Sequence, residues 1–367
     1  MSKKNEQESD FDFSTLSDSI EENFQKQAKK TINEIDEAKL VFCLVGNVNA
    51  GKSQFVNTIL RDKIAKVGPV AGLTKKVTIY EHPHIKNVFL ADSPGLEDVN
   101  EQISDKTQTF IIKNANALLF FINASVGVTK TERDAYIHFK NILKLPIIPV
   151  ISKIDTLDDE DLPILINDVK EKLDIPKDGA IYPISCKTGI GVEELSIAFS
   201  NYLSDAQKAK FARITNISKV RDDSVDKWIT AAAAAAFGIG VVPIPGSDII
   251  PLTILQVGLI TKIAYVYDVE ITKKEAMVLI TETVAGQVGK AVFRTALKAA
   301  GWVFGPIGGF ITAGIAGAVA GGLTFGLGKA AKAYYRSGMR ISTEELREIF
   351  EISQKEYKKM KKLKESN

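Results

Sequence analysis

The 367-residue chain has only two cysteines, Cys43 and Cys186, and three histidines. Two cysteines cannot form the disulfide framework of a small secreted protein, and no Cys/His spacing suggests a zinc site. The 47 lysines and arginines nearly balance 45 aspartates and glutamates, so the basic excess typical of nucleic-acid-binding proteins is absent. The first residues, MSKKNEQESDFDFS, contain no apolar segment of the secretory type. These absences predict a reducing, cytoplasmic compartment.

Hydrophobic residues make up 45% of the chain and charged residues 25%, which excludes a fully disordered or fibrous protein. The length allows two or three domains at about 100–200 residues each. Residues 1–37 are polar and acidic and are expected to be partly disordered and partly helical. The expected domains that follow are an α/β domain at 38–205, a helical connector at 206–227, an apolar helical domain at 228–340 and a charged C-terminal helix at 341–367.

Short apolar runs alternate with amphipathic stretches throughout residues 38–205. Six runs are expected strands, at 39–46, 75–80, 87–92, 117–123, 146–152 and 180–185. Stretches such as 53–64, 131–143 and 192–203 are expected helices. Strand and helix alternation predicts a doubly wound, mostly parallel, six-stranded α/β sheet with helices on both faces.

The C-terminal half is rich in alanine and glycine and is predicted to be all-α. Two runs, 228–247 and 299–328, carry no charge. The second exceeds the roughly 20 apolar residues that a membrane span needs. Small residues let helices approach closely, both in a buried helical bundle and inside lipid. Both interpretations therefore stay open for this half of the chain.

Residues 46–53, GNVNAGKS, fit the pattern G-x-x-x-x-G-K-[ST] between an expected strand and an expected helix. Such glycines let backbone N–H groups wrap around a phosphate, and the helix N-terminus adds a favourable dipole. Lys52 is expected to reach the β and γ oxygens of the nucleotide, and Ser53 to bind Mg²⁺. The loop residues expected to contact the nucleotide are Asn47, Val48, Asn49, Ala50, Gly51, Lys52, Ser53 and Gln54.

Three further motifs follow three of the expected strands. They are Asp92-Ser-Pro-Gly95, Ser152-Lys-Ile-Asp155 and Ser185-Cys-Lys187. The carboxyl ends of parallel strands meet at one edge of the sheet, where doubly wound folds bind their ligands. Asp92 is expected to hold the Mg²⁺ shell, and Gly95 to offer its N–H to the γ-phosphate.

With these motifs in this order, residues 38–203 resemble a P-loop GTPase of the TrmE/Era-like group within the Ras-like G-domain superfamily. The resemblance implies that Asp155 pairs with guanine, which selects GTP over ATP, and that Lys153 lies along the base. Ser152 departs from the Asn or Thr usual at the first position of this motif. The residues that correspond to the S-A-K motif near guanine O6 are Ser185, Cys186 and Lys187.

The resemblance also implies a threonine that closes over Mg²⁺ in the first switch. We assign Thr74 to this role, with Thr78 as the second choice because it falls in an expected strand. The predicted catalytic residues are Lys52, Thr74 and Gly95.

The position that holds a water-orienting Gln in Ras-like enzymes is Leu96 here, and leucine cannot hold a water. Another group must therefore orient the attacking water, and Glu97 and Asp98 are candidates. Some TrmE/Era-like proteins use an Asn at the position of Asn49 to bind K⁺, often across a G-domain homodimer. Asn49 is accordingly a K⁺ candidate, and the alternative is that it only supports the shape of the loop.

In the C-terminal half, residues 242–269 resemble a helical domain found in YcjF-like membrane proteins. This second resemblance implies a membrane-linked module and no reaction. The lysines of the last helix are either a basic surface for anionic lipid or a solvated helix end. They are Lys355, Lys358, Lys359, Lys361, Lys362 and Lys364.

Together these features predict a GTP-binding protein with slow hydrolysis to GDP and phosphate, acting as a switch at or in a membrane through its C-terminal half. Expected partners are GTP and GDP, membrane lipids, a second G domain and a protein effector. Nucleic acid is not expected. The alternatives are a soluble assembly or regulatory GTPase linked to the ribosome or RNA, and a GTP-binding scaffold with little hydrolysis.

Overall fold

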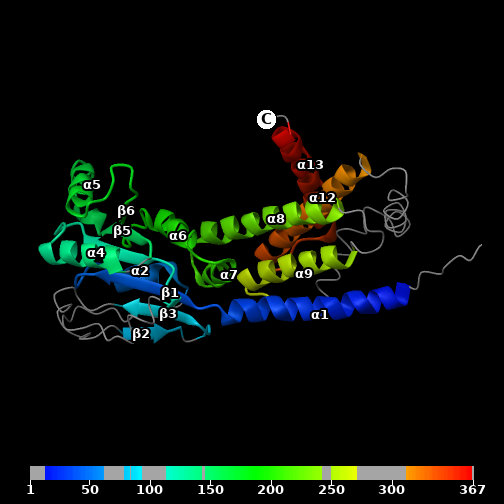
Figure 1. Ribbon diagram of the computed structural model, residues 1–367, viewed down its shortest axis with the longest axis horizontal. Helices are drawn as coiled ribbons and strands as arrows, with labels where there is room; N and C mark the ends of the chain where they lie inside the picture. Colours follow the sequence, from blue (N-terminus) through cyan, green and yellow to red (C-terminus); the bar gives the residue numbers. More distant parts are fainter. Residues whose placement is uncertain are drawn as a thin grey trace, which may run out of the picture. The chain divides into compact units, whose positions relative to one another are not determined.

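The computed structural model describes residues 13–61, 78–82, 84–92, 113–142, 145–241, 249–270 and 311–365. The chain divides into two compact units. One unit is residues 34–224, and the other combines residues 1–33 with 225–367. Figure 1 shows both units and labels most of their helices and strands.

A six-stranded sheet in the order β2-β3-β1-β4-β5-β6 forms the centre of the 34–224 unit. All neighbouring strands pair in parallel except β2 and β3, which are antiparallel. The predicted six-stranded, mostly parallel sheet is therefore observed, with the antiparallel strand at one edge (Figure 1). The strands are β1 Leu40–Gly46, β2 Thr78–Glu81, β3 Val88–Asp92, β4 Leu118–Asn123, β5 Ile147–Ser152 and β6 Tyr182–Ile184.

Helices cover both faces of this sheet, so its central strands are buried on both sides. On β1, Phe42 and Leu44 lie in one hydrophobic core, whereas Val41 and Cys43 lie in the other. The strand period of two explains this alternation, and it places Cys43 in the core. The helices of the unit are α2 Lys52–Ile59, α4 Lys130–Ile142, α5 Asp161–Lys172, α6 Val192–Ser200 and α7 Asp205–Ile214.

Helix α7 lies in the stretch that the sequence suggested as a connector, and it packs onto the sheet. Phe211 of α7 meets Phe42 of β1 with ring centroids 5.7 Å apart and Phe199 of α6 at 5.6 Å. A capping box between Ser204 and Gln207 begins the helix. The aromatic contacts make α7 part of the core of this unit.

Lys210, on the same helix, is fully buried and makes a cluster of contacts that we call the carbonyl latch. Its Nζ donates to the backbone carbonyl oxygens of Asp36 at 2.9 Å, Ala38 at 2.6 Å and Lys86 at 2.8 Å. Asn87 Nδ2 also donates to the Asp36 carbonyl oxygen, at 2.8 Å. One ammonium group thus joins the end of α1 Phe13–Glu37, the turn between β2 and β3, and α7.

The other unit is helical throughout its described residues and consists of the greater part of α1 with α9 Ile249–Val266, α12 Ile311–Arg336, α13 Thr343–Glu365 and the part of α8 Ser218–Val241 that follows Ser224. The glycines of α12 face close neighbours. A Cβ on Gly326 would lie 2.8 Å from Phe350 Cδ2, and one on Gly328 would lie 2.7 Å from Ile229 Cγ1. Small residues here let α12 approach other helices of the same unit. Among the described residues, no helix combines the length and apolar character needed to cross a membrane.

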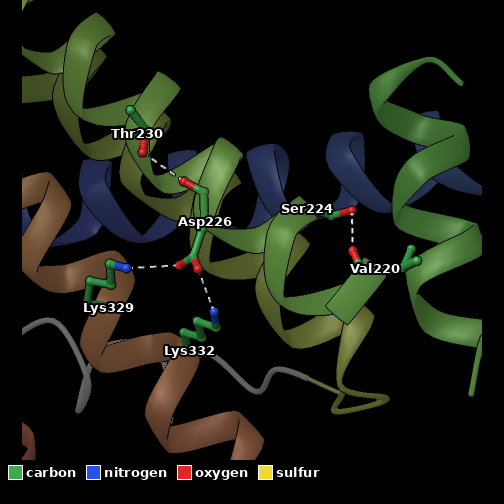
Figure 2. Close-up of polar contacts among 6 residues, drawn as sticks. All are labelled: Val220, Ser224, Asp226, Thr230, Lys329 and Lys332. Atoms are coloured by element: carbon green, nitrogen blue, oxygen red, sulfur yellow. Dashed lines mark hydrogen bonds and ion pairs between the residues drawn. The ribbon is translucent and has the colours of Figure 1, made fainter. Parts of the chain in front are cut away.

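A charged cluster joins α8 to α12 within this apolar unit (Figure 2). The two carboxylate oxygens of Asp226 bind Lys329 Nζ at 3.0 Å and Lys332 Nζ at 2.9 Å. Burial acts to raise the pKa of Asp226, but the hydrogen bonds from Lys332 and Lys329 outweigh it and lower that pKa. Lys332 exposes only 13% of its side chain, so Asp226 pairs with a largely buried ammonium group.

Candidate functional site

The loop after β1 folds into a compact nest. Lys52, the first residue of α2, is buried, and its Nζ donates to the carbonyl oxygens of Gly46 at 2.7 Å and Asn47 at 3.0 Å. Gly51 and Asn49 adopt positive φ values of 83° and 63°. Backbone turns of this kind direct N–H groups toward a bound anion. The loop between β1 and α2 therefore has a backbone shape compatible with the expected phosphate contacts.

Gly46 is required at the end of β1 because the loop passes close to β4. Its φ is 151°, and a Cβ at this position would collide with the carbonyl oxygen of Phe121. No side chain fits there without moving the backbone of a central strand. The first glycine of the loop is thus fixed by packing against the sheet as well as by the turn.

Ser152, at the end of β5, contacts the same loop. Its Oγ lies 2.7 Å from the carbonyl oxygen of Ala50 and 3.1 Å from that of Ile122. A Cβ added to Gly51 would lie 3.6 Å from the Cβ of Ser152, which is an ordinary van der Waals distance. The serine that departs from the family pattern therefore holds the loop to the sheet through its hydroxyl group.

Asp155 and Ser185 meet although they follow different strands. Ser185 Oγ donates to Asp155 Oδ1 at 2.6 Å, and Lys187 Nζ lies 3.9 Å from Asp155 Oδ2. The backbone N–H of Thr188 donates to Ser185 Oγ at 3.2 Å. Lys153 holds a left-handed backbone with φ of 60°. These contacts orient the Asp155 carboxylate.

Cys186 lies beside these residues but is no candidate for reactivity. Burial raises the pKa of its thiol to about 11, with a smaller opposing contribution from a hydrogen bond with Thr58. A thiol with a raised pKa is a poor nucleophile at neutral pH.

A second group of side chains borders the loop, and the motif search did not select it. Thr129 and Glu132 form a capping box at the start of α4, with the Thr129 N–H donating to Glu132 Oε2 at 2.9 Å and the Glu132 N–H donating to Thr129 Oγ1 at 3.2 Å. Asn47 Nδ2 donates to Thr129 Oγ1 at 3.3 Å. The pattern T-K-T-E before an amphipathic stretch was the sequence signal for this box.

Glu132 is only 1% exposed. Burial raises the pKa of its carboxyl group, and hydrogen bonds from Thr129 and the Asn47 backbone, with the nearby Lys52 charge, offset part of that rise.

The predicted switch residues lie outside the described residues. They are Thr74, Gly95, Leu96, Glu97 and Asp98. The backbone of Asp92 is described, and it ends β3 opposite Leu44 of β1. Ser53 is the second residue of α2, which follows β1, and Asp92 ends the neighbouring strand β3. Hydroxyl and carboxylate oxygen donors of this kind suit Mg²⁺.

Comparison with known proteins gives two family matches along the chain. Residues 41–153 match a family described as 50S ribosome-binding GTPase, and residues 205–362 match a domain of unknown function, DUF697. The second match includes α7, which packs in the 34–224 unit. The chain therefore carries a GTPase domain followed by a DUF697 domain.

Two curated GTPases each match less than half of this chain. GTPase Era of Aquifex aeolicus is 28% identical over 172 residues, which is 45% of this chain and 56% of that protein. The tRNA modification GTPase MnmE of Thermoanaerobacter sp. is 32% identical over 163 residues, which is 43% of this chain and 33% of that protein. The chain thus spans about half the length of the Era relatives and a third of MnmE.

Solved structures give similar matches. Aquifex aeolicus Era bound to GDP·AlF4⁻ is 26% identical, with a TM-score of 0.36, over 45% of this chain and 56% of that one. A structure of Era in complex with MgGDPNP and part of 16S ribosomal RNA is 25% identical, with a TM-score of 0.36, over 46% of this chain and 58% of that one.

Proposed function

Because the chain carries a GTPase domain of the kind found in Era and MnmE, we propose that it binds GTP and hydrolyses it slowly to GDP and phosphate. The observation that supports this most is that two features, a closed phosphate loop and an oriented carboxylate, are both present in the structure. The buried Lys52 closes the phosphate loop, and the Ser185–Asp155 contact orients the carboxylate that the guanine base requires. Phosphates and base would be held by separate loops.

The roles of the residues follow from their chemistry. The Asp155 carboxylate accepts two N–H bonds from guanine, and adenine offers no such pair of donors. The backbone N–H groups of residues 47–53 and the Lys52 ammonium neutralise the β and γ phosphates, which is the main requirement for phosphoryl transfer. Ser53 and Asp92 would hold Mg²⁺, which supplies further positive charge at the γ-phosphate.

Hydrolysis needs charge and an oriented water beyond what these residues supply. We propose Thr74 and Gly95 for closure over the γ-phosphate and Asn49 as a ligand of K⁺, with a second G domain completing the site in a homodimer. The positive φ of Asn49 sets its backbone within the turn of the phosphate loop. A K⁺ ion there would add charge near the β and γ phosphates. Without a partner, we expect turnover on the order of 10⁻⁴ to 10⁻² per second.

The test is single-turnover GTP hydrolysis and GTP binding by the full chain in KCl and in NaCl. We expect faster turnover in KCl, and we expect Ser53→Ala to weaken Mg²⁺-dependent GTP binding about tenfold because it removes the hydroxyl ligand. Thr230→Ala, which removes an exposed hydroxyl from α8 outside the GTPase unit, is the matched control and should bind GTP normally. Equal GTP binding by Ser53→Ala and the wild type would contradict the assignment of the phosphate site. Equal rates in the two salts would remove the K⁺ role alone.

We propose further that the helical unit associates with a membrane surface. Two features of α13 support this. Lys358 and Lys362 are exposed, and Leu363 beside them exposes 65% of its surface. A basic helix end with an apolar residue suits an anionic leaflet.

Liposome flotation of the full chain with GDP or a non-hydrolysable GTP analogue tests this proposal. We expect the wild type to float with vesicles that contain phosphatidylserine, and the Lys358→Glu/Lys362→Glu variant to float severalfold less. The matched control is Lys172→Glu/Lys177→Glu, which makes the same charge change on the GTPase unit. If the wild type stays in the dense fraction in both nucleotide states, the membrane role is wrong. The alternative, an RNA-linked or ribosome-linked GTPase like the Era relatives, would then be tested by salt-dependent RNA co-purification.

A further inference from the structure

Three helices of the described chain begin with a capping box, and one of the three boxes differs from the others. Ser342 and Glu345 at α13 repeat the geometry of Thr129 and Glu132, with Glu345 Oε2 2.9 Å from both the N and the Oγ of Ser342. Glu345 is exposed, however, whereas Glu132 is 1% exposed. The third box, at α7, uses the neutral Gln207. A buried carboxylate is therefore not needed to cap a helix.

Burying a carboxylate costs free energy unless it is fully hydrogen-bonded or paired. For Glu132, interactions in addition to the helix-capping hydrogen bond offset this free-energy cost. Its carboxylate accepts the hydroxyl of Thr129 at 2.9 Å and the backbone N–H of Asn47, and it interacts electrostatically with Lys52. Two of these three groups belong to the phosphate loop.

The Asn47 N–H belongs to the peptide unit that also contains the Gly46 carbonyl. That carbonyl oxygen accepts Lys52 Nζ at 2.7 Å. A peptide unit is planar, with its N–H and C=O pointing in opposite directions. Glu132 holds one end of this plane, and Lys52 is held at the other. Hydrogen bonds in such a chain polarise and strengthen one another.

We propose that Glu132, braced by Thr129, is a positioning residue for Lys52 and acts through the Gly46–Asn47 peptide. The inference rests on the proposed GTPase function, because Lys52 is the side chain expected at the β and γ phosphates. Loss of the Glu132 charge frees the peptide to tilt. The Lys52 ammonium is positioned by its hydrogen bond to the Gly46 carbonyl oxygen, so it then shifts together with the peptide.

The experiment measures the kcat for GTP hydrolysis, the KM and the Kd for GDP in the full-length chain. Glu132→Gln keeps the size of the side chain and a neutral cap. We expect kcat to fall about tenfold and GDP binding to weaken severalfold, as for residues that orient the groups in contact with a ligand. Glu345→Gln changes the matching box at α13 and should keep both values within twofold of the wild type. Melting temperatures of the two variants report the loss of helix capping itself.

Thr129 supplies the second pair of variants. Thr129→Ser keeps the hydroxyl and should retain wild-type turnover, whereas Thr129→Val removes it and should follow Glu132→Gln. This pair decides the question if Glu132→Gln does not fold. Wild-type kcat and GDP affinity in both Glu132→Gln and Thr129→Val would overturn the inference and leave the GTPase function intact. Absence of GTP turnover and of GDP binding in the wild type itself would instead refute the proposed function.

Discussion

Replacing Lys210 with methionine is expected to lower the free energy of unfolding of the 34–224 unit by about 3–5 kcal/mol. Methionine keeps the apolar stem but removes the ammonium of the carbonyl latch. The carbonyl oxygens of Asp36, Ala38 and Lys86 then lose a charged donor inside the protein, and each buried acceptor left without a partner costs about 1–3 kcal/mol. Hydrogen exchange of the backbone amides in β1 and β3 of the full chain measures this loss.

The latch also predicts a dependence on pH. Burial lowers the pKa of Lys210 from 10.5 to about 8, and the Asp36 charge opposes this change only in part. Between these two values the unfolded chain binds more protons at this residue than the folded chain does, so the contribution of Lys210 to stability rises with pH. The difference between the wild type and Lys210→Met should therefore widen from pH 7.5 to pH 10.

Lys208→Met is the control for the latch, because Lys208 is on the same helix and only half-buried. We expect it to change amide protection by less than about 0.5 kcal/mol. Equal protection losses in the two variants would show that the ammonium contacts of Lys210 add nothing beyond an ordinary helix substitution.

Two neighbouring glycines of α12 should respond in opposite directions to the same substitution. A Cβ on Gly321 would collide with the hydroxyl of Tyr357 and lie 2.9 Å from the carbonyl oxygen of Ala233. On Gly322 it would lie 3.7 Å from Tyr357 Cδ1, which is ordinary contact. We expect Gly321→Ala to destabilise the helical unit by about 3 kcal/mol, at the upper end of overpacking costs. Gly322→Ala should be neutral or stabilising by up to about 1 kcal/mol, because alanine favours helix more than glycine does.

Chemical denaturation of each full-length variant carrying Trp302→Phe, followed by the fluorescence of the remaining Trp228, measures this difference. The experiment separates helix propensity from packing, since both substitutions add one methyl group to one helix. Destabilisation of the two variants by the same amount would indicate that α12 does not pack against Ala233 and Tyr357 as described.

The sheet of the GTPase domain could be predicted because its central strands are buried on both faces and form continuous apolar runs in the sequence. The phosphate loop and Asp155 were equally visible, since each follows such a run. Thr129 and Glu132 were not selected, although their capping box is a sequence pattern. Their importance depends on the proximity of Asn47, which is 82 residues from Thr129, and no local pattern reports that distance.

Lys210 shows why α7 was harder to place. The sequence DAQKAKFARI falls almost entirely in the helical connector expected at 206–227, and a lysine in such a segment suggests a solvated face. The Lys210 side chain is nevertheless fully buried, because three carbonyl oxygens from residues distant in the sequence accept hydrogen bonds from its ammonium group. The glycine-rich runs of α12 were ambiguous for a related reason. Small residues permit close helix packing in water and in lipid alike, so only the neighbours of each glycine distinguish the two.

The Ser152 hydroxyl has a consequence for how affinity for GTP is distributed. It carries one proton, and the carbonyl oxygens of Ala50 in the phosphate loop and Ile122 in β4 lie within reach of it. Three residues further along the chain is the aspartate assigned to the base. A ligand that displaced either loop would change the partner of this proton, so the free energies of the proposed contacts with the base and with the phosphates would not be additive. The binding free energies of guanosine and of inorganic pyrophosphate, measured separately, would then not add up to the binding free energy of the nucleotide. The difference would be the coupling energy carried by this single hydroxyl group.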